Sequence, residues 1–421
     1  MKSLCLTVFL CLLAAPYALA EAESDELKAL RSQVDQLTGA VRELTATVQA
    51  QQQRLDALEI EKQSASAKVD AQPTAPAVSA IPAKSRSTGT SLSALNPEIG
   101  VNADFVGQLS ESSQDGEGND KLSAREVELV FGHPIDPYSR LDVTVAFSDF
   151  EEVELEEAFI THWGLPADLR ARVGRMRPKI GKASVLHRDQ LDTVDEPLVV
   201  DRYLGEEGLF RTGADVSAFL PVPWEAVTHE LTAGILEGGV GEGATLFGTS
   251  RRRPTLYTHL KNFWDPTDET SAELGLTYLT GSSDADASFE VHAVGVDATV
   301  KHFVTPSNPL KWQSEIFIQD RDETTNALNH PWGAYSLLDY RLNQQWAVGG
   351  RLDYVEPTDL FAASQARDAD TAFGGYLTFY QSEWARWRMQ YRHTDFAAGG
   401  DDDSFFVQGT VSIGVHKHAL Q

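Results

Sequence analysis

The sequence predicts an all-β fold, a 16-stranded antiparallel transmembrane β-barrel, preceded by an α-helical coiled coil. Three features of the 421 residues lead to this prediction. An N-terminal leader is followed by an apolar heptad pattern, the chain from Asn96 onward alternates apolar and polar residues, and the connections between the alternating segments are short and long in turn. The helical part therefore comes first, and the β part occupies most of the chain.

Residues 1–20 have the features of a secretory signal peptide. A basic Lys2 precedes an apolar run from Leu4 to Ala15, and the segment ends in a small-x-small cleavage site. A membrane anchor is the alternative, but the apolar run is short and has no basic stop-transfer flank. Both cysteines of the chain lie in this leader. The remaining chain is therefore expected to have no disulfide, thiol nucleophile or thiolate metal site.

Residues 21–62 are predicted to form the coiled coil. Apolar residues recur there in steps of three and four, with mostly Val at position a and Leu at position d, a combination that favours two strands. A lone amphipathic helix is the alternative, but its apolar stripe would be wider. Residues 63–96 are rich in Ala, Ser, Pro and Thr and show no periodicity. That composition predicts a flexible linker.

Residues 97–421 consist of segments in which the side chains alternate in character. In ARWRMQYR (385–392), Arg or Gln stands at every even position, and Trp387, Met389 and Tyr391 occupy three of the odd positions. Successive side chains of a strand point to opposite faces, so this pattern predicts a strand with one polar and one apolar face. About sixteen segments of this kind follow one another along the chain.

The connections between the predicted strands distinguish a membrane barrel from a soluble fold. Connections such as 133–137 and 343–345 are short, and they alternate with longer polar ones such as 109–124 and 356–371. A soluble secreted all-β protein is the alternative, but its two ends face the same solvent and would not need this alternation. Outer-membrane barrels have an even number of strands, brief turns at one end and longer loops at the other. In such a barrel the apolar faces contact outer-membrane lipid, and the polar faces line a water-filled lumen.

The charge of the chain excludes some partners. Residues 97–421 carry 26 Lys and Arg against 52 Asp and Glu, and the whole chain has a formal net charge of −27. Nucleic acid requires clustered positive charge, so no nucleic-acid partner is expected.

One segment resembles a known family. In GRMRPKIGKASVLHRDQLDTVDEPLVVDRYLGEEGLFRTGADV (174–216), a strand leads through a basic Pro/Gly stretch into a long loop and returns with a G-x-x-x-x-G-x-D strand. This arrangement resembles porins of the phosphate-selective O and P type, in a broad sense. The coiled coil is similar to that of saccharide porins. Two features depart from the phosphate-selective pattern: acids outnumber bases, and the C-terminus lacks the final aromatic residue.

The resemblance implies a function and a location. The protein is expected to be an outer-membrane porin, a channel for passive diffusion of small hydrophilic solutes or ions, in a Gram-negative bacterium with the N-terminal segment in the periplasm. It is also expected to be a homotrimer. A structural or adhesive outer-membrane protein, whose coiled coil links the membrane to the periplasm, is the alternative function.

Residues 177–206 are the candidate constriction. Counted from the first strand, they form the third outer loop, which folds inward in trimeric porins. They combine apolar, basic and acidic residues, and a purely solvated loop would not need the apolar set. A surface loop packed on the rim of the barrel is the alternative.

Alternation also assigns charged side chains to the lumen, with basic and acidic residues in different sectors. The alternative is that these charges only keep the lumen wet and pair locally. The candidate pore-lining or solute-contacting residues are Arg170, Arg172, Lys179, Lys182, Arg188, Arg211, Arg351, Arg386, Arg388, Arg392, Glu126, Glu128, Glu154 and Glu156.

The sequence gives no support for an enzyme. There is no G-x-S-x-G nucleophile elbow, and the histidines are scattered singly. His416 and His418 are a two-residue pair without a third ligand, which is more typical of a terminal strand than of a metal site. No catalytic residue, metal or cofactor is predicted.

Overall fold

The computed structural model describes residues 96–112, 120–149, 153–206, 208–222, 226–239, 245–248, 251–283, 286, 289–322, 330–358 and 368–414. The predicted signal peptide (1–20), coiled coil (21–62) and linker (63–96, except Asn96) lie outside the described residues, as do His416 and His418. No helix in the described part of the chain is long and apolar enough to cross a membrane.

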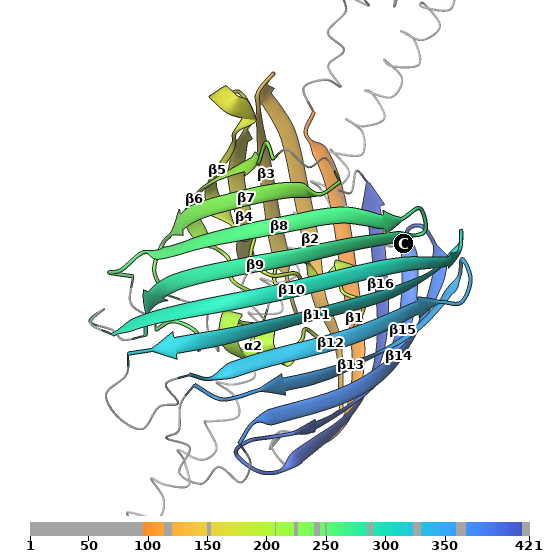
Figure 1. Ribbon diagram of the computed structural model, residues 1–421. Coiled ribbons are helices and arrows are strands. Elements are labelled where there is room, and N and C mark those ends of the chain that lie inside the picture. Colours follow the sequence, from red (N-terminus) through yellow and green to blue (C-terminus); the bar gives the residue numbers. More distant parts are fainter. Residues whose placement is uncertain are drawn as a thin grey trace, which may run out of the picture. The chain divides into compact units, whose positions relative to one another are not determined.

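Sixteen strands form one closed barrel (Figure 1), in which each strand pairs antiparallel with its neighbours in sequence and β1 pairs with β16. The all-β, sixteen-stranded antiparallel fold is therefore confirmed. The strands are β1 (Glu98–Ser112), β2 (Lys121–Asp136), β3 (Ser139–Phe147), β4 (Glu154–His162), β5 (Arg170–Met176), β6 (Arg211–Phe219), β7 (Thr228–Leu236), β8 (Thr255–Thr267), β9 (Thr270–Ser282), β10 (Glu290–Thr305), β11 (Asn308–Arg321), β12 (Trp332–Arg341), β13 (Trp346–Val355), β14 (Asp370–Ser382), β15 (Ala385–Asp395) and β16 (Asp401–Gly414).

One predicted connection is shorter in the structure than the sequence suggests, and a second proline also lies within a strand. The segment 133–137 is predicted to be a short connection, yet Pro134 pairs with Arg140 and β2 continues to Asp136. Likewise, Pro309 pairs with Phe303 at the start of β11. Register shifts next to both prolines accommodate the missing N–H donor, which is where proline is tolerated in a sheet.

The two faces of each strand have opposite surroundings, as β15 illustrates. Trp387 and Met389 are 50% and 54% exposed, whereas Arg386 and Arg388 are 3% and 2% exposed. Large apolar side chains are exposed in the same way on every strand from β1 to β16, for example Phe105 on β1, Phe219 on β6 and Leu352 on β13. The outer surface of the barrel is therefore apolar, and the polar face of each strand points inward.

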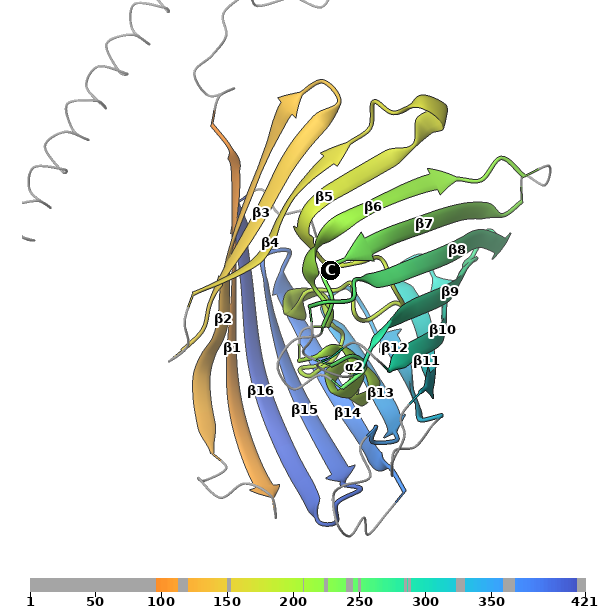
Figure 2. The same ribbon diagram turned by 90° about the vertical axis from the view of Figure 1, so that its left-hand side faces the viewer.

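The longest connection, between β5 and β6, lies inside the barrel. It contains the 3₁₀ turn η3 (Arg188–Gln190) and the helix α2 (Leu198–Leu204), which begins after Pro197 and ends at Gly205. Figure 2 shows α2 within the ring of strands, where it contacts β12 and β13. A second 3₁₀ turn, η2 (Pro166–Asp168), connects β4 and β5. We call residues 177–206 the inner loop.

The apolar residues of the inner loop form the hydrophobic core of the molecule. Ile180, Val199 and Leu204 are fully buried and share one cluster with strand residues such as Phe317 and Tyr376. This cluster explains why the loop carries apolar residues at all. Burying one such side chain contributes about 1.5–3 kcal/mol, so the cluster holds the loop against the inner wall, from β4 and β5 and from β7 to β14.

Candidate functional site

Arginines of β13 and β15 hold the second half of the inner loop. Arg351 lies 2.6 Å from the Asp195 carboxylate and donates to the Thr193 hydroxyl at 2.6 Å. Arg388 donates to the backbone carbonyls of Thr193, at 2.8 Å, and Leu191, at 2.9 Å. Both arginines are almost fully buried. Their donors bind the loop, and the prediction that they contact solute stays a prediction.

Asp195 is the central anchor on the loop side. Besides Arg351 it binds Arg392, whose Nη1 lies 2.9 Å from its carboxylate, and it accepts a hydrogen bond from Gln390. Burial alone would raise the pKa of Asp195, but the charges of Arg351 and Arg392 hold it well below its ordinary value. The carboxylate is thus charged at neutral pH and is neutralised by two arginines from the wall.

Two lysines attach the first half of the inner loop to the opposite part of the wall. Lys179 forms an ion pair with Glu230 of β7 at 2.7 Å, and Lys182 forms one with Glu273 of β9 at 2.8 Å. Lys261 of β8 also lies 2.8 Å from Glu273. The loop is therefore fixed to walls on different sides of the barrel, and it crosses the lumen between them.

Gly181 lets the loop backbone approach β11 closely. It has φ +59°, and a Cβ built there would lie 1.7 Å from a carboxylate oxygen of Glu315. The other oxygen of Glu315 accepts the backbone N–H of Ala183 at 3.2 Å. Only glycine combines this backbone conformation with this approach.

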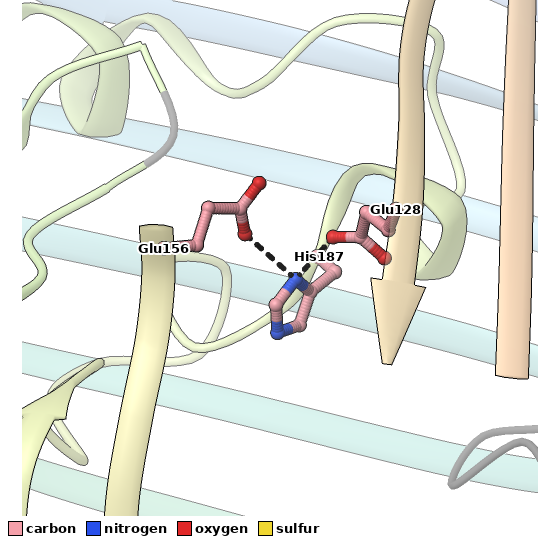
Figure 3. A group of neighbouring side chains, drawn as sticks. All are labelled: Glu128, Glu156 and His187. Atoms are coloured by element: carbon pink, nitrogen blue, oxygen red, sulfur yellow. Dashed lines mark hydrogen bonds and ion pairs between the residues drawn. The ribbon is translucent and has the colours of Figure 1, made fainter. Parts of the chain in front are cut away.

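His187 joins the loop to β2 and β4 in a cluster of carboxylates (Figure 3). Its Nδ1 lies 2.7 Å from Glu128 and 3.4 Å from Glu156, and its Nε2 lies 3.4 Å from Glu157. Burial and the neighbouring Arg177 lower the pKa of His187, but Glu128 and Glu156 outweigh them and raise it well above its ordinary value. The ring is therefore an imidazolium that donates from both nitrogens.

The same cluster has the side chains that a metal site uses, but its histidine is protonated, whereas a metal-binding histidine must be neutral. One ligand atom each from Glu128, Glu156 and His187 lies within 4.8 Å of the others. A histidine binds a metal through a neutral nitrogen, whereas both nitrogens here face carboxylates. The Arg177 guanidinium, 3.4 Å from Glu156, adds a further positive charge. The arrangement is consistent with an ion-pair anchor.

A β-bulge explains why two consecutive glutamates take part. Thr144 pairs with Glu157 and Val145 pairs with Leu155, so Glu156 is an extra residue in β4. Glu156 and Glu157 are both buried as a result. Simple alternation selects Glu154 and Glu156, and it misses Glu157. Glu154 lies at the start of the strand, where its side chain is 53% exposed and binds Arg175.

The remaining predicted site residues have individual surroundings. Arg172 binds Asp215 of β6 through two nitrogens, at 2.5 and 3.1 Å. Arg188 lies 3.0 Å from Glu206 and 3.5 Å from Glu126. Arg211 lies at the start of β6, where it donates to the carbonyls of Gly239 and Phe210. Arg170 forms no hydrogen bond or ion pair with any residue that the structure describes.

Lys311, Asp192 and Glu157 are site residues that the sequence analysis did not select. Lys311 of β11 forms an ion pair with Asp192 of the loop. Alternation within KWQSEIFI (311–318) already assigns Lys311 to the same face as the buried Gln313 and Glu315. Its partner could not be found in this way, because a loop has no periodicity that fixes which side chain meets which strand.

Two neighbouring cavities remain between the first half of the loop and the wall. One, of about 210 Å³, is lined by residues of β1 to β5, among them Asn102 and Arg172. The other, of about 350 Å³, is lined by residues of β7 to β9, among them His259. Lys179 and Val185 line both cavities. The open space beside the first half of the loop thus lies on the β1–β9 side. A further cavity, of about 190 Å³, lies beside the second half of the loop and is lined by Asp195 and by Arg392 of β15, among others.

Comparison with known proteins gives a fold and no family. No family model matches the chain. A protein of Aquifex aeolicus (strain VF5), described as uncharacterized, is 27% identical over 310 residues, which span 65% of this chain and 64% of that protein. The match therefore covers less than two thirds of the relative's length.

Three solved structures share the barrel. OprB of Pseudomonas putida has a TM-score of 0.53 and 11% identity, over 76% of this chain and 94% of that one. The outer membrane channel DcaP of Acinetobacter baumannii has a TM-score of 0.51 and 11% identity, over 76% of this chain and 98% of that one. An anion-selective porin from Comamonas acidovorans has a TM-score of 0.51 and 9% identity, over 76% of this chain and 100% of that one. At these identities the likeness concerns the fold alone.

Proposed function

We propose that the protein is an outer-membrane porin of a Gram-negative bacterium. It forms a water-filled channel for passive diffusion of small hydrophilic solutes or ions, and the inner loop constricts this channel. The observation that carries the proposal is the position of the inner loop, which is bound to the wall through Lys179, Lys182 and Asp195 while cavities remain beside it.

The surface of the barrel supports the membrane location. Apolar side chains such as Phe105, Leu276, Leu352 and Met389 are exposed on its outside, although exposure of such a surface to water is unfavourable. A closed barrel also satisfies the backbone hydrogen bonds of every strand without a free edge, which a lipid environment requires. The proposal includes a signal peptide (1–20), a periplasmic coiled coil (21–62) and a linker (63–96).

The solute path in this proposal follows the two cavities on the β1–β9 side. Its walls are polar and carry both charges, for example Arg172 and Lys261 beside Glu157 and Glu230. A wall of this composition suits small hydrophilic solutes, and the paired charges give it no strong preference for one sign. The likeness to channel-forming barrels agrees with this function.

Single-channel recording in planar lipid bilayers tests the proposal. The purified full-length chain should produce discrete conductance steps in KCl, and a KCl gradient should give a reversal potential that reports its charge preference. A preparation that inserts into the bilayer and never produces steps would contradict the porin function. It would favour the structural or adhesive alternative, in which the coiled coil links the membrane to the periplasm.

A further inference from the structure

We propose that the inner wall of β11 to β15 holds a binding subsite for an anionic group, a carboxylate or a phosphate, centred on Arg386. The inference adds a binding site to the proposed channel. It rests on the proposed function in one respect, because the anion has to reach the site through the lumen. Arg386 belongs to the inward face of β15, two residues before the loop anchor Arg388.

The first step is the surroundings of Arg386 itself. Its side chain is 3% exposed, and its Nε and Nη2 atoms have no hydrogen-bond partner. It also forms no ion pair within the described part of the chain. A guanidinium has five N–H donors and stays charged, so burying one without partners is costly. A bound anion would remove that cost.

The second step is the charge around Arg386. Arg388 and Lys311 lie close enough to influence the same loop carboxylate, Asp192, as Arg386 does. Burial alone would raise the pKa of Asp192, but Lys311, followed by Arg388 and Arg386, lowers it below its ordinary value. Asp192 is therefore ionised, and its hydrogen-bonded partner is Lys311. It does not satisfy the donors of Arg386.

The third step is the excess of basic residues. Besides Asp192, a second carboxylate lies near Lys311 and Arg388, that of Asp339. It accepts a hydrogen bond from the Tyr376 hydroxyl at 2.9 Å. Two further cations lie on the same inward face: Lys301 pairs in register with Lys311, and Arg341 lies over the Tyr380 ring at 4.2 Å. Like charges directly opposite on paired strands repel. The cations of this group are Lys301, Lys311, Arg341, Arg386 and Arg388, and the carboxylates that face them among the described residues are Asp192 and Asp339.

These features define the ligand by its chemistry. A guanidinium binds the oxygens of a carboxylate or a phosphate through two parallel hydrogen bonds, and two or more nearby cations favour a divalent anion. Tyr380 pairs in register with Arg386 and adds a hydroxyl to the same face. A neutral solute would leave the charge of Arg386 uncompensated. The site therefore fits a small oxyanion better than a sugar.

Anion titration of the full-length protein tests the inference. In bilayers bathed in KCl, added phosphate or succinate should reduce the chloride conductance in a saturable way, and titration calorimetry in detergent should give the same affinity. In Arg386→Gln the affinity should fall about tenfold, as expected for losing a charge-assisted contact. If phosphate reduces the conductance and succinate does not, the site binds phosphate groups. If succinate reduces it and phosphate does not, the site binds carboxylates.

The matched control is Arg170→Gln. Arg170 is also an inward arginine without a partner among the described residues, but it lies on β5, so the substitution makes the same change in charge elsewhere in the lumen. It should shift the reversal potential and leave the affinity unchanged. Equal loss of affinity in both variants, or no saturable effect in the wild type, would overturn the inference.

A second variant separates binding from folding. Arg386→Lys keeps the charge and loses the planar pair of donors, so it should fold as the wild type does and bind phosphate or succinate more weakly. Wild-type affinity in this variant would contradict a site that depends on the guanidinium. Because calorimetry does not require conduction, a barrel that binds the anion but shows no conductance steps would contradict the porin function and leave the subsite standing.

Discussion

Arg386 and Arg388 stand two residues apart on one strand and point to the same side, yet they have opposite surroundings. Arg388 donates to two loop carbonyls, to Gln408 and to Thr378, whereas Arg386 has no partner within the described chain. Alternation in the sequence identifies the side on which both lie. The partner of each depends on where the inner loop runs, so the role of an inward arginine is decided by a distant segment of the chain.

Arg351 gives the first prediction at the residue scale. Arg351→Met should destabilise the barrel by about 3–5 kcal/mol, because it removes the guanidinium that binds the buried Asp353 and one of the two that bind Asp195. Urea unfolding of the refolded protein, followed by tryptophan fluorescence, measures the change. Arg251→Gln, at a side chain that is 78% exposed, is the control and should change the free energy of unfolding by no more than about 1 kcal/mol.

Met389 gives the second prediction at this scale, and it tests which face of β15 meets lipid. Met389→Arg should impair folding into lipid vesicles by about 2–4 kcal/mol, the cost of a basic residue on the lipid face near the middle of the bilayer. Met389→Leu keeps the face apolar and should fold as the wild type does. An unchanged folding yield for Met389→Arg would contradict the face assignment, since its neighbours would also have to be reassigned.

At the scale of elements, the inner loop and its bulged partner strand act together. The loop is held by an apolar cluster shared with most of the wall strands and by ion pairs to Glu230 of β7 and Glu273 of β9. The side of the strand on which a residue lies alternates with each residue, so it could be predicted from the sequence, as the inward arginines of β15 show. The bulge that turns Glu157 inward could not, because an extra residue leaves no periodic signal. The pairing of Asp192 with Lys311 could not either, because 119 residues separate the two.

The His187 cluster gives a prediction of pH dependence. The pKa of His187 is raised in the folded protein, so the imidazolium stabilises the loop fully below the pKa of an unfolded histidine. That stabilisation is lost as the pH rises through the folded pKa, which lies well above the ordinary value. Channel conductance should therefore become noisier or larger at alkaline pH and should be steady near neutrality.

A substitution of the same histidine provides the control for this pH dependence. His187→Gln has no titrating ring, so its conductance should already resemble the alkaline wild type at neutral pH and should not change further. An alkaline transition that persists in His187→Gln would assign the effect to other groups. Glu128, Glu156, Glu157 and Arg177 face the ring and remain in the variant.

Shortening the inner loop is the second test at the scale of elements. Replacing residues 186–200 by a short Gly/Ser linker removes Asp192 and Asp195, together with the carbonyls that Arg388 binds. Water would then hydrate the arginines of the wall, so the barrel should still fold and keep its heat-modifiable migration on gels. Single-channel conductance should rise. An unchanged conductance would show that the loop does not limit the passage of ions.

At the scale of the whole molecule, some properties of the barrel follow from local sequence patterns, and others depend on contacts between distant residues. The strand number and the inward and outward faces follow from local alternation and from the rhythm of the connections, and the closed sixteen-stranded barrel agrees with both. The path of the loop through the lumen depends on many long-range contacts, which a local pattern does not contain. The apolar outer surface is a property of the whole barrel, and in the proposed function it is the surface that meets lipid or another subunit.

The last prediction concerns assembly. We expect a homotrimer, although Val at a and Leu at d of residues 21–62 favour a two-stranded coiled coil in isolation. Contacts between the apolar outer surfaces of barrels bury more area than a coiled coil of a few heptads, so the barrel should set the number of subunits and the helices should follow. Native mass spectrometry in detergent should give three chains both for the full-length protein and for a variant that begins at residue 89. A dimer that becomes a monomer in the shortened variant would show instead that the coiled coil determines the assembly.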